Sequence, residues 1–480
     1  MATESKSVSG NILFRLFWWI VLRLNPQWAH KLMYFGLRDG SFGRTVVKDP
    51  ALSVNVWGHN FNTPIGIAGG VDKKGNIIDR LMQIGYGFGT FGPYTLEKEL
   101  PVKQTYYFRK EKSILVQCLG FRNPGLLKML PLFVKRRYLP HFVGVDLAIP
   151  AESEDQNIKQ GRHFTYQEEF VLMAQKVAPY CDFITLDLSH PNSELSMLVV
   201  DASTVVPIIK EVHEAVRVAA PIQTPPILVK IPLDLNTKEI PLVARNLVDS
   251  GVDGVVISGP LSLSKNSLMQ LPGLKDEHIG MLSGALIKEQ TLDLIRQIYE
   301  QTKGQVTIIG CGGVFTAEDA FEQIKAGASL IQIDNPTLTF GGPTCVSEIH
   351  RGLLRLLQEN HFSNVMEAIG SGVQKENWTT SPAHQNEEVQ QPESISAPVQ
   401  TEPEQPTVTE ETNVPSQPAQ AVQPEFTPTP VQPAPAAPTP VQPVQSPAAP
   451  EPVQPVQEQT SEEQNSQGTI PTPPVPPNQQ

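Results

Sequence analysis

The feature that most constrains the fold is a series of eight apolar segments, each long enough for one β-strand, between residues 60 and 360. They are continuous apolar runs without alternation, as expected of parallel strands that are covered on both faces. The segments are Pro64–Ala68, Tyr86–Gly92, Phe142–Leu147, Phe183–Leu188, Ile227–Ile231, Gly254–Ser258, Val306–Gly310 and Leu330–Asp334. Eight such strands with helices between them predict an α/β fold, namely a TIM (β/α)8 barrel.

Helical periodicity fills most of the gaps between these segments. The clearest helical segments are Gln167–Ala178, Val205–Val216, Leu242–Asp249, Ile287–Gln301 and Ala317–Ala326. The last begins with the pattern of a capping box, from Thr316 to Asp319. Residues 93–140 are longer than one strand-to-helix connection requires, so we expect them to add strands or a lid over the mouth of the barrel.

The segment Asn11–Leu24, NILFRLFWWIVLRL, is strongly apolar and aromatic but contains Arg15 and Arg23. It is too short to span a bilayer and lacks the cleavage site of a signal peptide. The sequence therefore favours a helix that lies in a membrane interface, and the alternative is a helix packed on the core. A second short helix is predicted at Gln27–Arg38.

The last hundred residues differ from the rest in composition. No Lys or Arg follows Lys375, and about a quarter of the residues from Ser381 onward are Pro. Such a segment buries too little apolar surface to fold, so we predict disorder with stretches of polyproline II. The repeated PVQP motif is either a ligand for proline-binding modules or part of a solvated linker. The predicted divisions are a disordered segment at 1–10, membrane-associating helices at 11–40, the barrel at 41–365 and a disordered tail at 366–480.

The charge is distributed unevenly along the chain. The net charge is −12, and the twelve Glu from residue 381 onward account for all of it. The remaining residues are balanced, so no basic surface argues for nucleic-acid binding. The four Cys have no CxxC spacing, which argues against a disulfide framework or a metal site and favours reduced thiols.

Active sites of TIM barrels lie at the carboxyl ends of the strands, and two lysines occur there. Lys73 follows the first strand and Lys230 lies in the fifth, so both are expected to point into the mouth and to attract anions. Gly310–Ile333 combines a glycine-rich loop with a capped helix, a pattern that favours phosphate binding. The alternatives are structural salt bridges for the lysines and tight turns for the glycines.

Residues 12–360 resemble class 2 dihydroorotate dehydrogenases, the membrane-associated, quinone-reducing, FMN-dependent TIM barrels of pyrimidine synthesis. The motifs that carry the resemblance appear in the family's order. They are NPQWAHKLMYFGLR, NTPIGIAGGVDKKG, LGFRNPG, LDLSHPNS, ILVKIPLDL, GVDGVVIS, MLSGAL and IIGCGGVFTAEDAFEQIKAGASLIQI. The resemblance implies oxidation of dihydroorotate, a membrane quinone as acceptor and, in a bacterium, the cytoplasmic face of the inner membrane.

The resemblance also implies roles for individual residues. The substrate contacts would be Lys73, Gln117, Phe121, Asp187 and Asn192. The FMN contacts would be Gly69, Gly70, Lys73, Asp146, Asp187, Lys230, Ser258, Gly284, Gly312, Gly313 and Asn335. The quinone tunnel would be lined by His30 and Arg109.

Several of these positions depart from the family pattern. His190 stands where class 2 enzymes have the catalytic Ser, and Asp146 and Asp187 stand where they have Asn. A histidine is the better base at neutral pH, but two extra carboxylates repel an anionic substrate and a reduced flavin. Three functions remain open. They are a divergent dihydroorotate dehydrogenase, an FMN or phosphate barrel with another substrate, and an inactive barrel in which the two acids neutralise Lys73 and Lys230.

Overall fold

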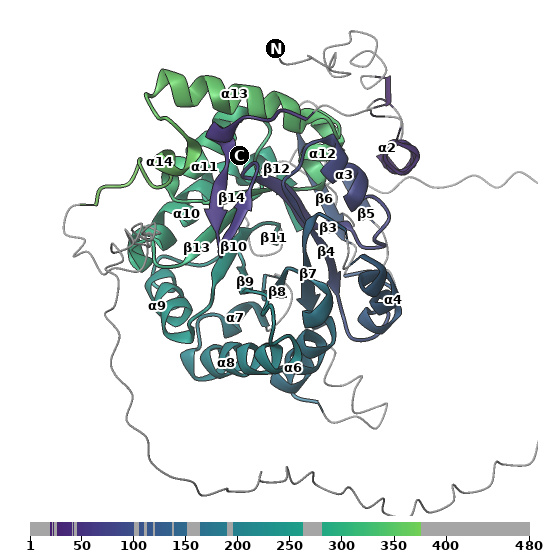
Figure 1. The fold of residues 1–480 in the computed structure, drawn as a ribbon, viewed down its shortest axis with the longest axis vertical. Helices are drawn as coiled ribbons and strands as arrows, with labels where there is room; N and C mark the ends of the chain where they lie inside the picture. Colours follow the sequence, from purple (N-terminus) through teal and green to yellow (C-terminus); the bar gives the residue numbers. More distant parts are fainter. Residues whose placement is uncertain are drawn as a thin grey trace, which may run out of the picture. The chain divides into compact units, whose positions relative to one another are not determined.

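The computed structural model describes residues 20–21, 23, 26–40, 42, 46–99, 105–109, 113–118, 121–136, 139–150, 164–189, 195–262 and 281–375 of the 480-residue chain. In this part of the chain, eight parallel strands close into a barrel, with neighbours in sequence order all the way round (Figure 1). The barrel strands are β3 (Ile65–Asp72), β4 (Phe88–Tyr94), β7 (Phe142–Ala148), β8 (Phe183–Asp187), β9 (Ile227–Ile231), β10 (Gly254–Ser258), β13 (Thr307–Cys311) and β14 (Leu330–Ile333). The predicted TIM barrel is confirmed, and each predicted apolar segment overlaps one of these strands.

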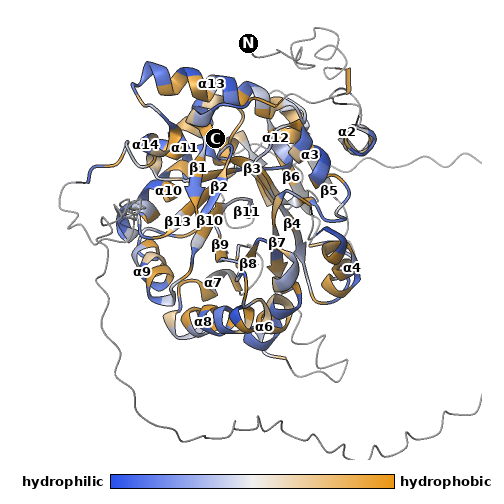
Figure 2. Ribbon diagram, in the orientation of Figure 1, coloured by the Kyte–Doolittle hydropathy of each residue, from blue (hydrophilic) through white to orange (hydrophobic). Residues whose placement is uncertain are grey.

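Helices surround the barrel and bury their apolar faces on it. They are α3 (Ile78–Ile84), α4 (Leu126–Arg136), α6 (Tyr166–Val177), α7 (Leu195–Leu198), α8 (Ala202–Ala219), α9 (Ile240–Ser250), α10 (Lys288–Thr302), α11 (Ala317–Ala326), α12 (Asn335–Gly341), α13 (Cys345–Glu359) and α14 (Val365–Ala368). Short 3₁₀ turns lie at Pro50–Leu52, Ala178–Tyr180 and Ala285–Ile287. Figure 2 shows both orange and blue segments along α8, as expected of a helix with one face on the core. The predicted capping box of α11 is present.

A second sheet joins two insertions beside the barrel. Its strands run in the order β11 (Leu261–Ser262), β12 (Met281–Gly284), β6 (Ile114–Cys118) and β5 (Thr105–Arg109), all antiparallel. The strands β5 and β6 are the extra strands expected within residues 93–140. The partner strands β11 and β12 come from the connection after β10, which the sequence did not indicate.

Aromatic side chains fill the amino-terminal end of the barrel. The hairpin of β1 (Val54–Val56) and β2 (His59–Phe61) places Phe61 5.6 Å from the Phe88 ring and 4.8 Å from the Phe142 ring, between centroids. Phe142 stacks in turn on Phe183 at 5.7 Å. A Cβ atom on Gly144 would lie 2.2 Å from the Phe183 ring, so glycine there makes room for the aromatic layer. With this end closed by packing, the carboxyl ends of the strands are left to form a site.

Two predicted boundaries can be compared with the described residues. Helix α2 (Pro26–Asp39) matches the helix predicted at Gln27–Arg38, whereas most of the predicted helix at Asn11–Leu24 lies outside the described residues. The predicted boundary at residue 365 is wrong. The fold continues through α14 to residue 375, because the backbone N–H of Gly370 donates to Ile324 O at 3.0 Å and that of Gly372 to Lys325 O at 2.9 Å. These bonds attach the segment to α11.

A buried histidine makes the stability of the barrel sensitive to acid. His350 of α13 is fully buried, its Nε2 lies 2.6 Å from Thr63 Oγ1, and its Nδ1 has no partner among the described residues. Burial lowers the pKa of His350 from 6.5 to about 4, and the charge of Arg351 adds to this shift. The unfolded chain therefore binds a proton at a higher pH than the folded protein does.

We expect the free energy of unfolding to fall by up to about 3 kcal/mol as the pH drops from 6.5 through 4, since His350 is neutral when folded and charged when unfolded. Denaturant unfolding at several pH values measures this slope. The variant His350→Gln keeps a hydrogen-bonding side chain but does not titrate, so it should lose this part of the slope. An unchanged slope would contradict the assignment to His350.

Candidate active site

The carboxyl ends of the barrel strands surround a cavity of about 140 Å³. The predicted site residues that line it are Gly69, Gly70, Lys73, Phe121, Asp187, Lys230, Ser258 and Asn335. The cavity is also lined by Pro93, Ser189, Cys311 and Asp334, which we had not predicted as ligand contacts. Most of the described candidates therefore line one cavity, as expected from the rule that TIM-barrel sites lie at the carboxyl ends of the strands.

One lysine and two acids form an ion-pair cluster in the barrel beneath the mouth. Lys230 Nζ lies 2.9 Å from Asp187 Oδ2 and 3.4 Å from Asp146 Oδ2. The exposed fractions of the side chains are 12% for Lys230, 4% for Asp187 and 2% for Asp146. The sequence led us to expect that, in an inactive barrel, the two acids would neutralise the two lysines. The structure differs, because both acids pair with Lys230.

The two acids are not equivalent. Burial raises the pKa of Asp146 to about 7, in spite of the attraction of Lys230. Burial also favours the neutral form of Asp187, but the charge of Lys230 and hydrogen bonds from Ser189 N (2.9 Å) and Oγ (2.6 Å) outweigh it and hold the pKa of Asp187 below its ordinary value. The pKa of Lys230 is raised, because its two carboxylates together exceed the effect of burial. Asp146 is thus the acid of the cluster that is more readily protonated.

Lys73 has a different environment. Its Nζ donates a hydrogen bond of 2.5 Å to the carbonyl oxygen of Phe121, which also lines the cavity. Burial lowers the pKa of Lys73 to about 8, Glu99 opposes this shift, and the neighbouring charge of Lys230 adds to it. The pKa of Lys73 is thus the lower of the two lysine pKa values.

Asp72 organises the loop that follows β3, a role that we had not predicted. Its Oδ1 accepts hydrogen bonds from the backbone of Lys74 (3.3 Å) and Asn76 (3.0 Å). Its Oδ2 accepts from Ile77 (2.8 Å) and Ile78 (2.9 Å) at the start of α3. The sequence signal was an Asp between a strand and the helix that follows. An Asp at such a position typically accepts hydrogen bonds from the backbone N–H groups of the next few residues.

The glycine-rich loop after β13 has a structural reason for its glycines. Gly312 and Gly313 have φ values of 111° and 74°, and a Cβ atom on Gly313 would lie 2.6 Å from Lys288 Cα. Thr316 caps the amino end of α11, and Asp319 of the same capping box accepts from Phe315 N and Thr316 N at 2.9 Å each. Neither glycine lines the cavity, so phosphate binding at this loop stays a prediction.

The other predicted cofactor residues differ in position. Asn335 Nδ2 donates to Gly70 O at 3.1 Å and ties the segment after β14 to the loop after β3. Gly284 belongs to β12 in the side sheet and does not line the cavity. Its φ of 100° and the 2.1 Å between an added Cβ atom and Ser113 O explain the glycine.

Several predicted residues cannot be placed. His190 and Asn192 lie outside the described residues. Gln117 in β6, His30 in α2 and Arg109 in β5 are described only through their backbone. The predicted base, part of the substrate site and the quinone contacts therefore stay predictions.

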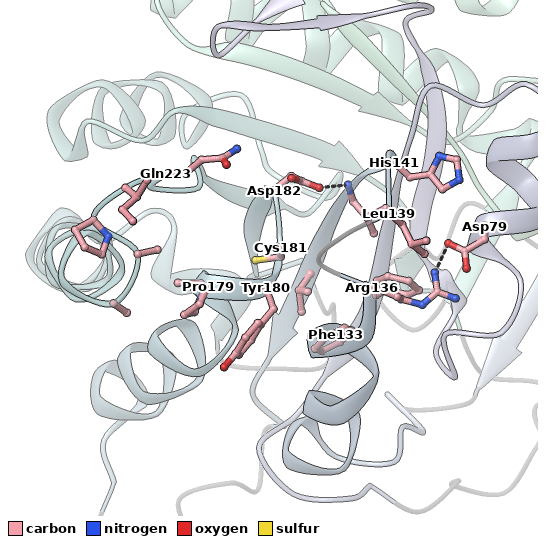
Figure 3. A pocket seen from close by; sticks show the side chains of 18 residues that line it. Asp79, Phe133, Arg136, Leu139, His141, Pro179, Tyr180, Cys181, Asp182 and Gln223 are labelled. Atoms are coloured by element: carbon pink, nitrogen blue, oxygen red, sulfur yellow. Dashed lines mark hydrogen bonds and ion pairs between the residues drawn. The ribbon is translucent and has the colours of Figure 1, made fainter.

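A larger cavity of about 340 Å³ lies away from the mouth, near the amino ends of β7 and β8 (Figure 3). Its charged side chains already have partners within the fold. Arg136 forms an ion pair with Asp79 and lies over the Phe91 ring, and Asp182 Oδ2 accepts from Val143 N at 2.7 Å. None of the residues that we predicted for chemistry lines this cavity, so the mouth is the stronger candidate in spite of its smaller volume.

Comparison with known proteins gives one consistent family. The family described as dihydroorotate dehydrogenase matches residues 51–357. The dihydroorotate dehydrogenase (quinone) of Rhodospirillum rubrum is 29% identical over 364 residues, which cover 75% of this chain and 94% of the relative. The mitochondrial dihydroorotate dehydrogenase (quinone) of Mus musculus is 30% identical over 352 residues, which cover 72% of this chain and 87% of the relative. The ligand-free dihydroorotate dehydrogenase of Eimeria tenella superimposes with a TM-score of 0.63 at 25% identity, over 72% of this chain and 99% of that chain.

Proposed function

The chain belongs to the dihydroorotate dehydrogenase family, and on that basis we propose that it oxidises dihydroorotate to orotate with FMN as cofactor and a membrane quinone as electron acceptor. The observation that carries the proposal is the convergence of Lys73, Lys230 and Asp187 on one cavity at the carboxyl end of the barrel. This places the reaction in pyrimidine biosynthesis.

The described residues fit the pyrimidine edge of a flavin. That edge has one N–H donor and two carbonyl acceptors, and the cavity offers a carboxylate acceptor in Asp187 and cationic donors in Lys230 and Lys73. Gly70, at a φ of 96°, leaves space beside it, since an added Cβ atom would approach only Asn335 Nδ2, at 4.0 Å. When bound, FMN supplies the acceptor for the two electrons removed from the substrate.

The chain's own residues would share the remaining work. Lys73 and Phe121 would both contact the anionic substrate, with the Lys73 ammonium turning from Phe121 O to the substrate carboxylate. His190, as proposed from the sequence, would take the proton next to the substrate carbonyl, because a neutral imidazole accepts a proton near pH 7.

The helix α2 supports the proposed contact with a membrane. Trp28, Leu32 and Phe35 share one helix face and are exposed, with exposed fractions of 65% for Trp28 and 66% for Phe35, while Met33 and Leu37 are buried. Lys31 Nζ lies 5.0 Å from the centre of the Trp28 ring, a pairing suited to the headgroup region. Among the helices that the structure describes, none is long and apolar enough to cross a bilayer. We therefore propose that residues 11–40 lie on the membrane surface, which in a bacterium would be the cytoplasmic face of the inner membrane.

Replacing Trp28 and Phe35 together by Ser is expected to weaken binding to lipid vesicles by about tenfold or more, because two large apolar side chains no longer enter the interface. Co-sedimentation of the full chain with vesicles measures this loss. The matched control is Leu242→Ser on α9, where the leucine is 51% exposed on another face of the barrel. Equal binding by all three proteins would contradict the role of α2.

The proposed reaction is tested on the purified full chain in two steps. A visible flavin spectrum, either as purified or after addition of FMN, is expected first. Dihydroorotate is then expected to reduce a soluble quinone analogue only when the protein is present. A colourless protein that FMN cannot reconstitute would contradict the proposed function.

The ion-pair cluster favours a second candidate function. Lys230 already has two carboxylate partners, so a barrel that binds no flavin would have its buried charge partly neutralised. Such a chain would act as a scaffold through its Pro-rich tail, which the sequence offers as a ligand for proline-binding modules. Failure to bind FMN, together with loss of a cellular role on deletion of residues 381–480, would support this candidate.

A further inference from the structure

Asp146 is a buried acid with an unfilled hydrogen-bonding capacity. It lies in β7 with 1% of its surface exposed and packs against the backbone of β3, where an added Cβ atom on Gly69 would lie 2.3 Å from Asp146 Oδ2. Its Oδ1 has no hydrogen-bond partner within the described residues. It does not line the cavity and lies behind Lys230, which does. Asp146 can therefore affect a ligand only through its neighbours.

The contacts within the cluster are shared unequally. Asp187 has the shorter contact with Lys230, at 2.9 Å, and two further hydrogen bonds from Ser189. Among the described residues, the Asp146 carboxylate has only the contact of 3.4 Å with Lys230. A proton that enters the cluster therefore goes to Asp146, because its carboxylate is the less stabilised of the two.

The charges around Asp146 decide what a proton there would change. The groups that face it are Lys73 after β3, Asp187 on β8, Lys230 on β9 and Cys311 on β13, with Asp334 beyond Cys311. With both acids ionised, the charges of Lys73, Lys230, Asp146 and Asp187 sum to zero. With Asp146 protonated, the same four side chains carry one net positive charge, and Lys230 presents it to the mouth.

We propose that Asp146 is a positioning residue that takes up one proton from solvent when an anionic ligand enters the mouth, so that Lys230 turns from two carboxylate partners to one and pairs with the ligand. The inference rests on the proposed function, since orotate is the anionic ligand that the family implies for this mouth. The proton passes from water to a carboxylate oxygen of Asp146, and no bond of the ligand forms or breaks. Burial, which raises the pKa of Asp146 to about 7, places this uptake in an accessible pH range.

The variant Asp146→Asn imitates the protonated carboxyl and should keep the fold, because an amide has nearly the same shape. The test is calorimetric titration of the FMN-loaded full chain with orotate, in buffers of different ionisation enthalpy between pH 6 and 9. We expect the wild-type protein to take up close to one proton more per ligand than Asp146→Asn does at the upper end of this range. Above the pH at which Asp146 ionises, wild-type affinity should fall about tenfold per pH unit relative to the variant. The phosphate of FMN titrates equally in both proteins, so the difference isolates the carboxyl.

The matched control is Asp182→Asn, which changes another largely buried acid at the opposite end of the barrel and should behave as the wild type does. A second readout needs no ligand. Carbon-13 NMR of aspartate-labelled protein should show one carboxyl that titrates near neutral pH and is absent in Asp146→Asn.

Binding with equal proton uptake by wild type and Asp146→Asn would overturn the inference and leave the proposed function intact. Absence of binding to both proteins at every pH would overturn the proposed function and this inference with it.

Discussion

Replacing Lys230 by Met is expected to destabilise the folded barrel by about 3–5 kcal/mol at pH 8, because it leaves two carboxylates buried without a cation. Asp146 and Asp187 both lie within 4 Å of Lys230 Nζ, and neither acid is more than 4% exposed. Denaturant unfolding of the wild type and the variant measures the difference. The loss should shrink as the pH falls, since protonation removes the unpaired charges.

Two further variants make this prediction specific to the cluster. Lys230→Met combined with Asp146→Asn and Asp187→Asn should recover most of the lost stability, because the buried charges are then gone. Lys73→Met is the matched control. It removes one hydrogen bond, to Phe121 O, and should cost only about 1 kcal/mol. Similar losses for Lys230→Met and Lys73→Met would show that the two acids do not depend on Lys230.

Replacing Asp72 by Ala is expected to cost about 3–5 kcal/mol of stability, since four backbone N–H groups lose a charged acceptor in a buried loop. The Tyr34 hydroxyl of α2 also loses one of its acceptors, Asp72 Oδ1 at 3.2 Å, and keeps Val71 O at 3.1 Å, so the attachment of α2 to the barrel should weaken. Because the loop carries Lys73, binding of orotate should weaken as well. Thermal unfolding and orotate titration measure the two effects.

The control for Asp72 is a capping aspartate far from the mouth. Asp49 accepts a hydrogen bond from Ala51 N at 2.9 Å at the start of a 3₁₀ turn, so Asp49→Ala should cost about 1 kcal/mol and leave orotate binding unchanged. Limited proteolysis at the junction of α2 and the barrel adds a third readout. If Asp72→Ala were as stable as Asp49→Ala and bound orotate normally, the loop would not depend on Asp72.

The order and type of the barrel elements could be predicted because each strand is covered on both faces. The apolar runs Ile227–Ile231 and Gly254–Ser258 were predicted with the observed bounds, since a short apolar run between polar segments fixes both ends. The predicted segment for β3 ended four residues too early, because Gly69 and Gly70 look like a turn in sequence and yet continue the strand past a register shift. The pairing of β12 with β6 depends on segments more than 160 residues apart, which no local pattern specifies.

The candidate site could be predicted only in part, for a related reason. The strand-end rule placed Lys73, Asp187 and Lys230 in the mouth, because strand position fixes where a side chain begins. The rule did not predict which of these charged side chains form ion pairs. The distances among three side chains on β7, β8 and β9 depend on the register of neighbouring strands and on the length of the lysine.

The sequence by itself determined the fold class, the family and the end of the barrel at which chemistry is expected, because these follow from periodicity, motif order and the polarity of parallel strands. Only the tertiary structure decided that Asp146 and Asp187 share Lys230, that Lys73 instead contacts Phe121, and that Asp72 holds the loop between them. The physical reason is that ion pairing and burial act through space over a few ångströms. Residues 84 and 43 positions apart from Lys230 in the chain therefore become its nearest charges only once the barrel has closed.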